Sequence, residues 1–234
     1  IAVLFLTLLL GGLSAYLVSF YEFVGVNFFK YSLLLSFAIP PYIYAYTLSA
    51  FFENFGMAYS LISFFSEDLS RKLIPRIEPL VGSILSLSLT LFGYVFILAR
   101  STFLNQSRDL IEVGKSLGFN NVDTLFKIII PTARPAIFIG LSLVAMETLS
   151  DFGTVSFFGV STFTTGIYNS WFIFDDLKTA NFLSLFLVFF ILFFFGLESL
   201  SRKNIKFFNS NKSFNKKNKK TLLLGYKGFF AFLF

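Results

Sequence analysis

Two carboxylates, Glu147 and Asp151, lie four residues apart near the end of a strongly apolar stretch. In a helix this spacing places both side chains on one face. Carboxylates at membrane depth are costly, and they usually face the interior of a helix bundle or a water-filled path. We therefore predict that they line a translocation path and favour a cation. The alternative is that one or both lie at the membrane interface or pair with a basic residue.

A second polar feature is the charged segment 101–134, which separates two apolar stretches. Gly118 stands where a helix would end in a left-handed cap, a conformation that glycine adopts without steric penalty. Asn120 and Asn121 suit a turn and an N-cap, and Asp123 then lies in a first helical turn, where its charge favours the helix dipole. This pattern predicts two short helices joined by a tight turn.

The second of these helices is amphipathic. Its apolar residues follow the i, i+3, i+4, i+7 spacing: Val122, Leu125, Phe126 and Ile129. Pro131 disfavours helix at the residue before it, so we expect this helix to stop there, and Pro135 suits the first turn of the next span. These patterns leave two interpretations open, an amphipathic connector that shields the spans or a docking surface for a partner in the water phase.

The composition excludes an ordinary soluble domain, because 56% of the residues are hydrophobic and only 14% are charged. The 37 Phe residues are also what an AT-rich genome produces, so they carry no functional signal by themselves. With no Cys and no His, the chain lacks thiolate ligands and the commonest metal ligand and general base. We therefore predict no enzyme activity, no bound cofactor and no firm metal site.

The elements that must position these residues are membrane spans. Apolar stretches that read as spans cover residues 1–18, 28–52, 80–99, 136–149 and 182–200, and a sixth begins at 222. Pro40 and Pro41 would kink the second span, and residues 53–66 read as an interfacial helix. The predicted fold is an all-α, polytopic membrane helix bundle of about six spans, the last of them incomplete.

Lysine and arginine set the predicted orientation. The connection 201–221 holds eight basic residues and no acidic one, whereas loop 153–181 holds Asp175, Asp176 and a single basic residue. Segments 101–134 and 201–221 are therefore predicted to be cytoplasmic and to interact with anionic lipid. Residues 1–200 form the predicted transmembrane domain, 201–221 a basic linker, and 222–234 the start of a further span in what we expect to be a longer protein.

The spacing within the polar segment resembles a known motif. It reads Glu112-Val113-Gly114, Gly118, Ile128 and Ile130-Pro131, and it is similar to the cytoplasmic loop of ABC importer permeases, which opens Glu-Ala-Ala and closes Ile-x-Leu-Pro. This chain departs from that pattern at Val113, Gly114 and Ile130.

The resemblance implies that the loop docks on a separate subunit that binds and hydrolyses ATP. The residues it implicates are Glu112, Gly114, Gly118, Val122, Phe126, Ile128 and Pro131. Closure of the ATPase pair would then move the helices as rigid bodies and give alternating access. No Gly-rich phosphate loop occurs in the chain itself, in agreement with ATP being bound elsewhere.

Residues 146–168 resemble the iron(III)-type permeases of the same family. That resemblance implies a bacterial inner-membrane protein, a periplasmic substrate-binding protein, and a second permease half in the same full-length chain or a homodimer. Iron(III) is a hard ion that prefers oxygen ligands, which suits Glu147 and Asp151. Other small solutes such as thiamine, a phosphonate or an inorganic anion stay open, and a channel or secondary transporter is the alternative from another class.

Overall fold

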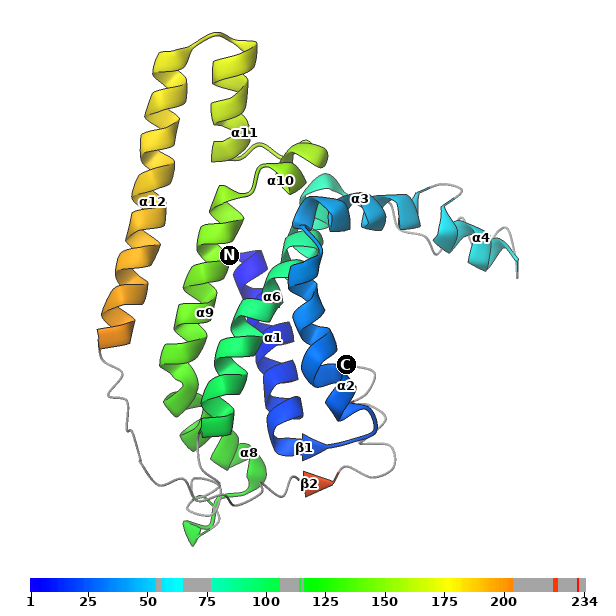
Figure 1. Ribbon diagram of the computed structural model, residues 1–234, viewed down its shortest axis with the longest axis vertical. Helices are drawn as coiled ribbons and strands as arrows, with labels where there is room; N and C mark the ends of the chain where they lie inside the picture. Colours follow the sequence, from blue (N-terminus) through cyan, green and yellow to red (C-terminus); the bar gives the residue numbers. More distant parts are fainter. Residues whose placement is uncertain are drawn as a thin grey trace.

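The computed structural model describes residues 1–53, 56–64, 77–105, 114, 116–203, 221–222 and 231. In this part of the chain the architecture is a bundle of long helices (Figure 1). Four helices are long and apolar enough to span a membrane: α1 (Ala2–Phe20), α6 (Pro79–Asn105), the helix Leu125–Ser150, and α12 (Leu177–Lys203). The predicted all-α membrane bundle is confirmed, although every one of these spans begins or ends a few residues away from its predicted boundary.

Helices α1 and α9 (Ile130–Ser150) pack closely on α6. A Cβ atom added to Gly11 of α1 would lie 2.6 Å from the carbonyl oxygen of Phe92, and one added to Gly140 of α9 would lie 3.0 Å from the Cα atom of Val95. Small residues at both contacts let the helix backbones approach, which is the usual source of packing between helices in a membrane. Helix α12 lies beside α9 at one side of the bundle (Figure 1).

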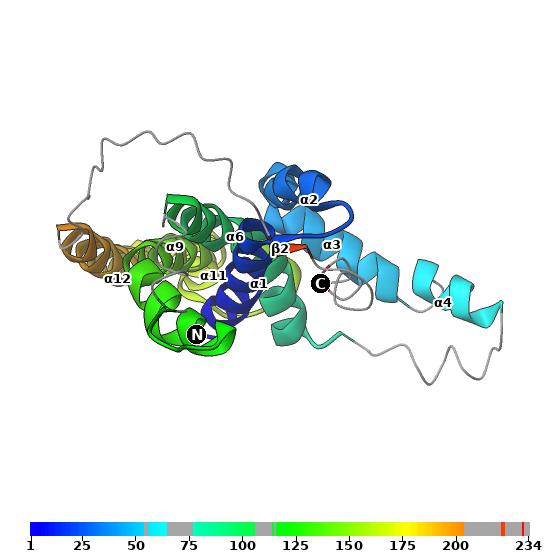
Figure 2. The ribbon, with the colours of Figure 1, turned by 90° about the horizontal axis from the view of Figure 1, so that it is seen from below.

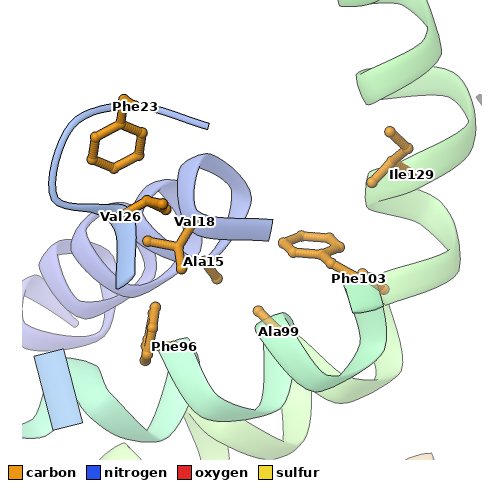
Figure 3. Close-up of a cluster of buried hydrophobic side chains, with 9 residues drawn as sticks. Ala15, Val18, Phe23, Val26, Phe96, Ala99, Phe103 and Ile129 are labelled. Atoms are coloured by element: carbon orange, nitrogen blue, oxygen red, sulfur yellow. The ribbon is translucent and has the colours of Figure 1, made fainter. Parts of the chain in front are cut away.

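The main core cluster joins three elements near one end of the bundle (Figure 3). Val18 of α1 and Phe96 and Phe103 of α6 are buried together with Ile129, which precedes α9. This end also holds the short helix α8 (Asn121–Thr124) and strand β1 (Tyr21–Glu22), which pairs in parallel with β2 (Thr221–Leu222). The core therefore lies directly beside the polar segment that the sequence singles out. Residues 204–220 of the predicted linker and most of the predicted sixth span lie outside the described residues.

The predicted second span is two helices at a steep angle, and the expectation of one kinked span was wrong. Helix α2 (Val26–Ser32) and the 3-10 segment η1 (Leu33–Ala38) run along the bundle, and α3 (Pro41–Phe52) then turns by 99°. Ile39 and Pro40 are extended, since the residue before a proline avoids helix and two successive prolines remove two donors. Helices α3 and α4 (Met57–Ser63) extend sideways from the bundle (Figures 1 and 2).

The helix predicted to stop before Pro131 continues instead. Helix α8 runs into a π-helical turn, η2 (Leu125–Ile129), and then into α9 without a break. In the π turn the Ile130 amide donates to the Leu125 carbonyl, which widens the helix just before the proline ring. The Thr132 hydroxyl also donates to the carbonyls of Ile128 and Ile129 at 2.9 and 2.8 Å. These adjustments let the helix accept Pro131 and Pro135.

The opposite end of the bundle carries a chain of short helices between α9 and α12 (Figure 1). These are α10 (Gly153–Phe157), α11 (Phe163–Tyr168) and the π-helical turn η3 (Asn169–Ile173). Asp151 follows the last residue of α9 and therefore belongs to this end, whereas α8 and the end of α6 lie at the other. The two polar features of the sequence are thus separated by the length of the bundle.

Candidate coupling loop and carboxylate site

The turn at Gly118 has the predicted left-handed conformation, with a φ of +78°. The Phe119 amide donates to the Gly114 carbonyl at 2.9 Å, the six-to-one bond that closes a helix in a Schellman motif. A Cβ atom at position 118 would meet nothing within 4 Å. The need for glycine here is therefore conformational, and it comes from the backbone alone.

Helix α8 begins as predicted, with Asn120 as its N-cap. The Asp123 amide donates to the Asn120 side-chain oxygen at 2.7 Å. Asp123 then forms an ion pair with Lys127 at 2.9 Å, and the Lys127 ammonium lies 4.8 Å from the centre of the Phe119 ring. This exposed pair adds little stability by itself, but together with the ring it ties the turn to the helix that follows.

The apolar residues of this segment divide between two sides. Ile129 is buried in the core cluster, and Leu125 packs against that cluster. Phe126 and Leu117 are each 62% exposed and lie on either side of the Gly118 turn. Large apolar side chains presented by a rigid turn are suited to bind a partner protein. Sequence reasoning identified Phe126 but missed Leu117, which belongs to the helix before the turn.

The other residues predicted for the loop are placed as follows. Ile128 and Pro131 are half-buried in the continuous helix. Gly114 is buried against Thr124, whose Oγ1 atom lies 2.6 Å from the position of an added Cβ. Glu112 lies outside the described residues, and so does the side chain of Val122. Thr124 was not singled out from the sequence, because its contact with Gly114 arises only when the turn folds back.

At the other end of the bundle, Glu147 is exposed on the surface of α9. Its carboxylate lies within hydrogen-bonding reach of the Tyr94 hydroxyl on α6. Among the described residues the only ion pair joins Lys127 to Asp123, so within this part of the chain Glu147 has no basic partner. The alternative in which it pairs with a lysine or arginine receives no support from these residues.

Asp151 has different surroundings, although it lies only four residues further along. Its carboxylate accepts hydrogen bonds at 3.1 Å from the Thr154 amide, the Thr154 hydroxyl and the Val155 amide. The Thr164 hydroxyl donates to its backbone carbonyl at 2.6 Å. Burial raises the pKa of Asp151, and the bonds from Val155 and Thr154 oppose that rise. This carboxylate anchors α10 and α11 to the end of α9.

The structure therefore separates the two carboxylates by role. Glu147 is open to a ligand from outside the chain, whereas most of the hydrogen-bonding capacity of Asp151 is used within the fold. Among the described residues there is no group of three or more His, Cys, Asp or Glu side chains that could hold a metal ion. The geometry can attract a passing cation at Glu147, and it offers no multidentate cage.

Comparison with known proteins decides the family. Residues 7–206 match the family described as "Binding-protein-dependent transport system inner membrane component". The chain belongs to this family. The resemblance of the Glu112–Pro131 segment to ABC importer permeases is thereby confirmed, and with it a multi-pass inner-membrane protein that is not itself an enzyme.

Two relatives and one solved structure place the chain further. It is 28% identical over 198 residues to the "Fe(3+)-transport system permease protein FbpB 2" of Haemophilus influenzae, covering 82% of this chain and 35% of the relative. It is 26% identical over 145 residues to a "Probable sulfate transport system permease protein cysT" of Chlorella vulgaris, covering 62% of this chain and 52% of the relative. The chain thus spans about a third and about half of the lengths of these relatives.

The fold is also similar to a solved structure described as an "amino acid ABC transporter with histidines". The TM-score is 0.57 with 15% sequence identity, and the match covers 87% of each chain. At this level of identity the match shows a shared fold.

Proposed function

We propose that the chain is the membrane-spanning part of an ATP-driven importer that carries iron(III) by alternating access. Membership of the family supports an importer component. Similarity to an iron(III) permease over 82% of the chain supports this substrate. The observation that carries the choice of a cation is Glu147, an exposed carboxylate on a spanning helix with no basic partner among the described residues.

The Gly118 turn is the proposed contact with the ATPase subunit. Phe126 and Leu117 would enter a groove on that partner, while Leu125 and Ile129 hold the loop on the bundle. ATP would be bound by the partner alone, and a substrate-binding protein would deliver the cargo on the opposite side. A second permease half, in the same full-length chain or as a second copy, would complete the pathway.

Sulfate is the second candidate, because sulfate permeases are among the relatives. A sulfate dianion passing an uncompensated carboxylate would be repelled, so the geometry favours a cation over sulfate. Thiamine and phosphonates also stay open.

Reconstitution separates these candidates. The full-length protein, its ATPase and its binding protein would be placed in liposomes, and ATP-dependent uptake of radiolabelled iron(III), sulfate, thiamine and a phosphonate would be compared. We expect uptake of iron(III) alone. Uptake of sulfate without iron(III) would overturn the proposed substrate and leave the importer class intact, whereas uptake without the ATPase would overturn the class.

A further inference from the structure

Glu147 is the only acidic residue within the four spans Ala2–Phe20, Pro79–Leu104, Leu125–Ser150 and Leu177–Leu197. Its helix ends three residues later, at Ser150. Side chains on a helix lean towards its N-terminus, so this carboxylate leans back into the span and away from the end. An exposed carboxylate at that depth would be costly against lipid, so this face of α9 must meet water or protein.

The partner of Glu147 comes from the helix that runs the other way. Val95 on α6 packs against Gly140 on α9, which places Tyr94 about two turns below Glu147 along the bundle. Because α6 and α9 are antiparallel, the two side chains lean towards each other and the Tyr94 hydroxyl reaches the carboxylate. The contact therefore follows from the register of the two helices.

Tyr94 is held from its other side by η1. The Phe37 ring meets the Tyr94 ring edge-on, with centroids 4.7 Å apart and planes at 71°. The neighbouring Gly93 lies so close to η1 that an added Cβ would be 2.7 Å from the Ser36 hydroxyl. The phenol is thus fixed in position before any ligand arrives.

A phenol differs from a basic side chain in what it leaves behind. Lysine or arginine would neutralise the carboxylate, whereas a tyrosine hydroxyl donates one hydrogen bond and leaves the negative charge. We infer that Tyr94 is a positioning residue for Glu147, and that the two together form a cation-selecting station in the half of the pathway that holds the α9–α10 junction. The inference rests on the proposed import of a cation and adds the residue that orients the charge.

The first test is a double-mutant cycle in the reconstituted transporter, with iron(III) uptake as the readout. Glu147→Gln should lower the uptake rate by an order of magnitude or more, and Tyr94→Phe by about tenfold through loss of a charge-assisted hydrogen bond. In the Glu147→Gln background, Tyr94→Phe should have no further effect. Independent effects that multiply in the double variant would overturn the positioning role.

Matched controls separate this role from general damage. Glu78→Gln removes an exposed carboxylate just before α6, and Tyr31→Phe removes an exposed phenol hydroxyl on α2. Both should transport at the wild-type rate. A loss in Glu78→Gln equal to that in Glu147→Gln would show that any lost charge slows uptake, and the inference would fail.

A second test asks whether the face is wet. This segment contains no cysteine, so single cysteines in it can be labelled without background from its own residues. Glu147→Cys should react with a charged, membrane-impermeant thiol reagent. Phe138→Cys should not, since it is 40% exposed but nine residues away on the opposite side of the same helix. Protection of both positions would overturn the station.

The two levels of the argument can fail separately. If the transporter carries a different solute, the proposed iron(III) function fails, and the cycle is repeated with that solute. Non-additivity together with labelling at position 147 would still support the station. Additive effects would overturn it, whatever the substrate.

Discussion

The contact between Gly114 and Thr124 gives a prediction in which one substitution changes sign with its background. A Cβ atom on residue 114 would lie 2.6 Å from Thr124 Oγ1, 2.7 Å from its Cγ2 and 3.2 Å from its Cβ. The first two distances are too short for any side chain, and Thr124 is 3% exposed. Gly114→Ala must therefore push Thr124 and the turn apart.

The size of the effect follows from two opposing terms. Overpacking of a buried contact costs about 1–3 kcal/mol, and replacing a helical glycine by alanine returns about 1 kcal/mol. We expect Gly114→Ala to destabilise the loop by up to about 2 kcal/mol. In a Thr124→Ala background both short contacts disappear, so the same change should stabilise it by up to about 1 kcal/mol.

The assay is thermal unfolding of the purified full-length transporter, with the midpoint compared across the four members of the cycle. Gly118→Ala in the same two backgrounds is the matched control, because a Cβ there meets nothing and its cost comes from the positive φ. That control should lower the midpoint equally in both. If Gly114→Ala also gave equal shifts in both backgrounds, within the few tenths of a kcal/mol expected for additive sites, the Gly114–Thr124 contact would be refuted.

Three further predictions concern the two ends of the bundle. Phe126→Ala should reduce co-purification of the ATPase subunit by about tenfold or more, whereas Phe138→Ala should not; equal loss in both would argue against docking at the turn. Ile129→Ala, at 3% exposure, should destabilise the protein by about 2–5 kcal/mol in thermal or denaturant unfolding; a change below 1 kcal/mol would contradict its place in the core. Asp151→Ala should expose residues 153–165 to hydrogen exchange while Asp151→Asn keeps them protected. Because burial raises the pKa of Asp151 in the folded state, its contribution to stability should fall as the pH rises from about 4 through that raised value, and Asp151→Asn should abolish the effect.

Local chemistry was predictable from the sequence, and that explains which features were anticipated. The left-handed Gly118 and the Asn120 cap depend on a few neighbouring residues, and both form as expected. The span positions follow from apolar runs and were identified to within several residues. The break at Pro40 was also predicted, but its 99° angle depends on how α3 packs beside α6 and α10, which no local pattern contains.

The contacts that matter most for the carboxylate site could not be predicted in this way. Tyr94 is 53 residues before Glu147 in the chain, and only the Gly140–Val95 contact sets the register that joins them. Asp151 shares a spacing with Glu147 that indicates a common face, but the hydroxyl and amides that occupy it come from α10 and its neighbours. Spacing along one helix says nothing about which partner the next element brings.

The error at Pro131 has a mechanical consequence. A helix that stopped there would form a hinge between the docking turn and the span, so movement of the turn would be lost in the joint. The observed helix instead runs from Asn121 to Ser150, about 45 Å at the usual rise per residue. Phe126 lies near one end and Glu147 near the other. A displacement of the turn by a partner is therefore carried by one continuous rod to the carboxylate, and the π turn before Pro131 is the local adjustment that keeps the rod unbroken.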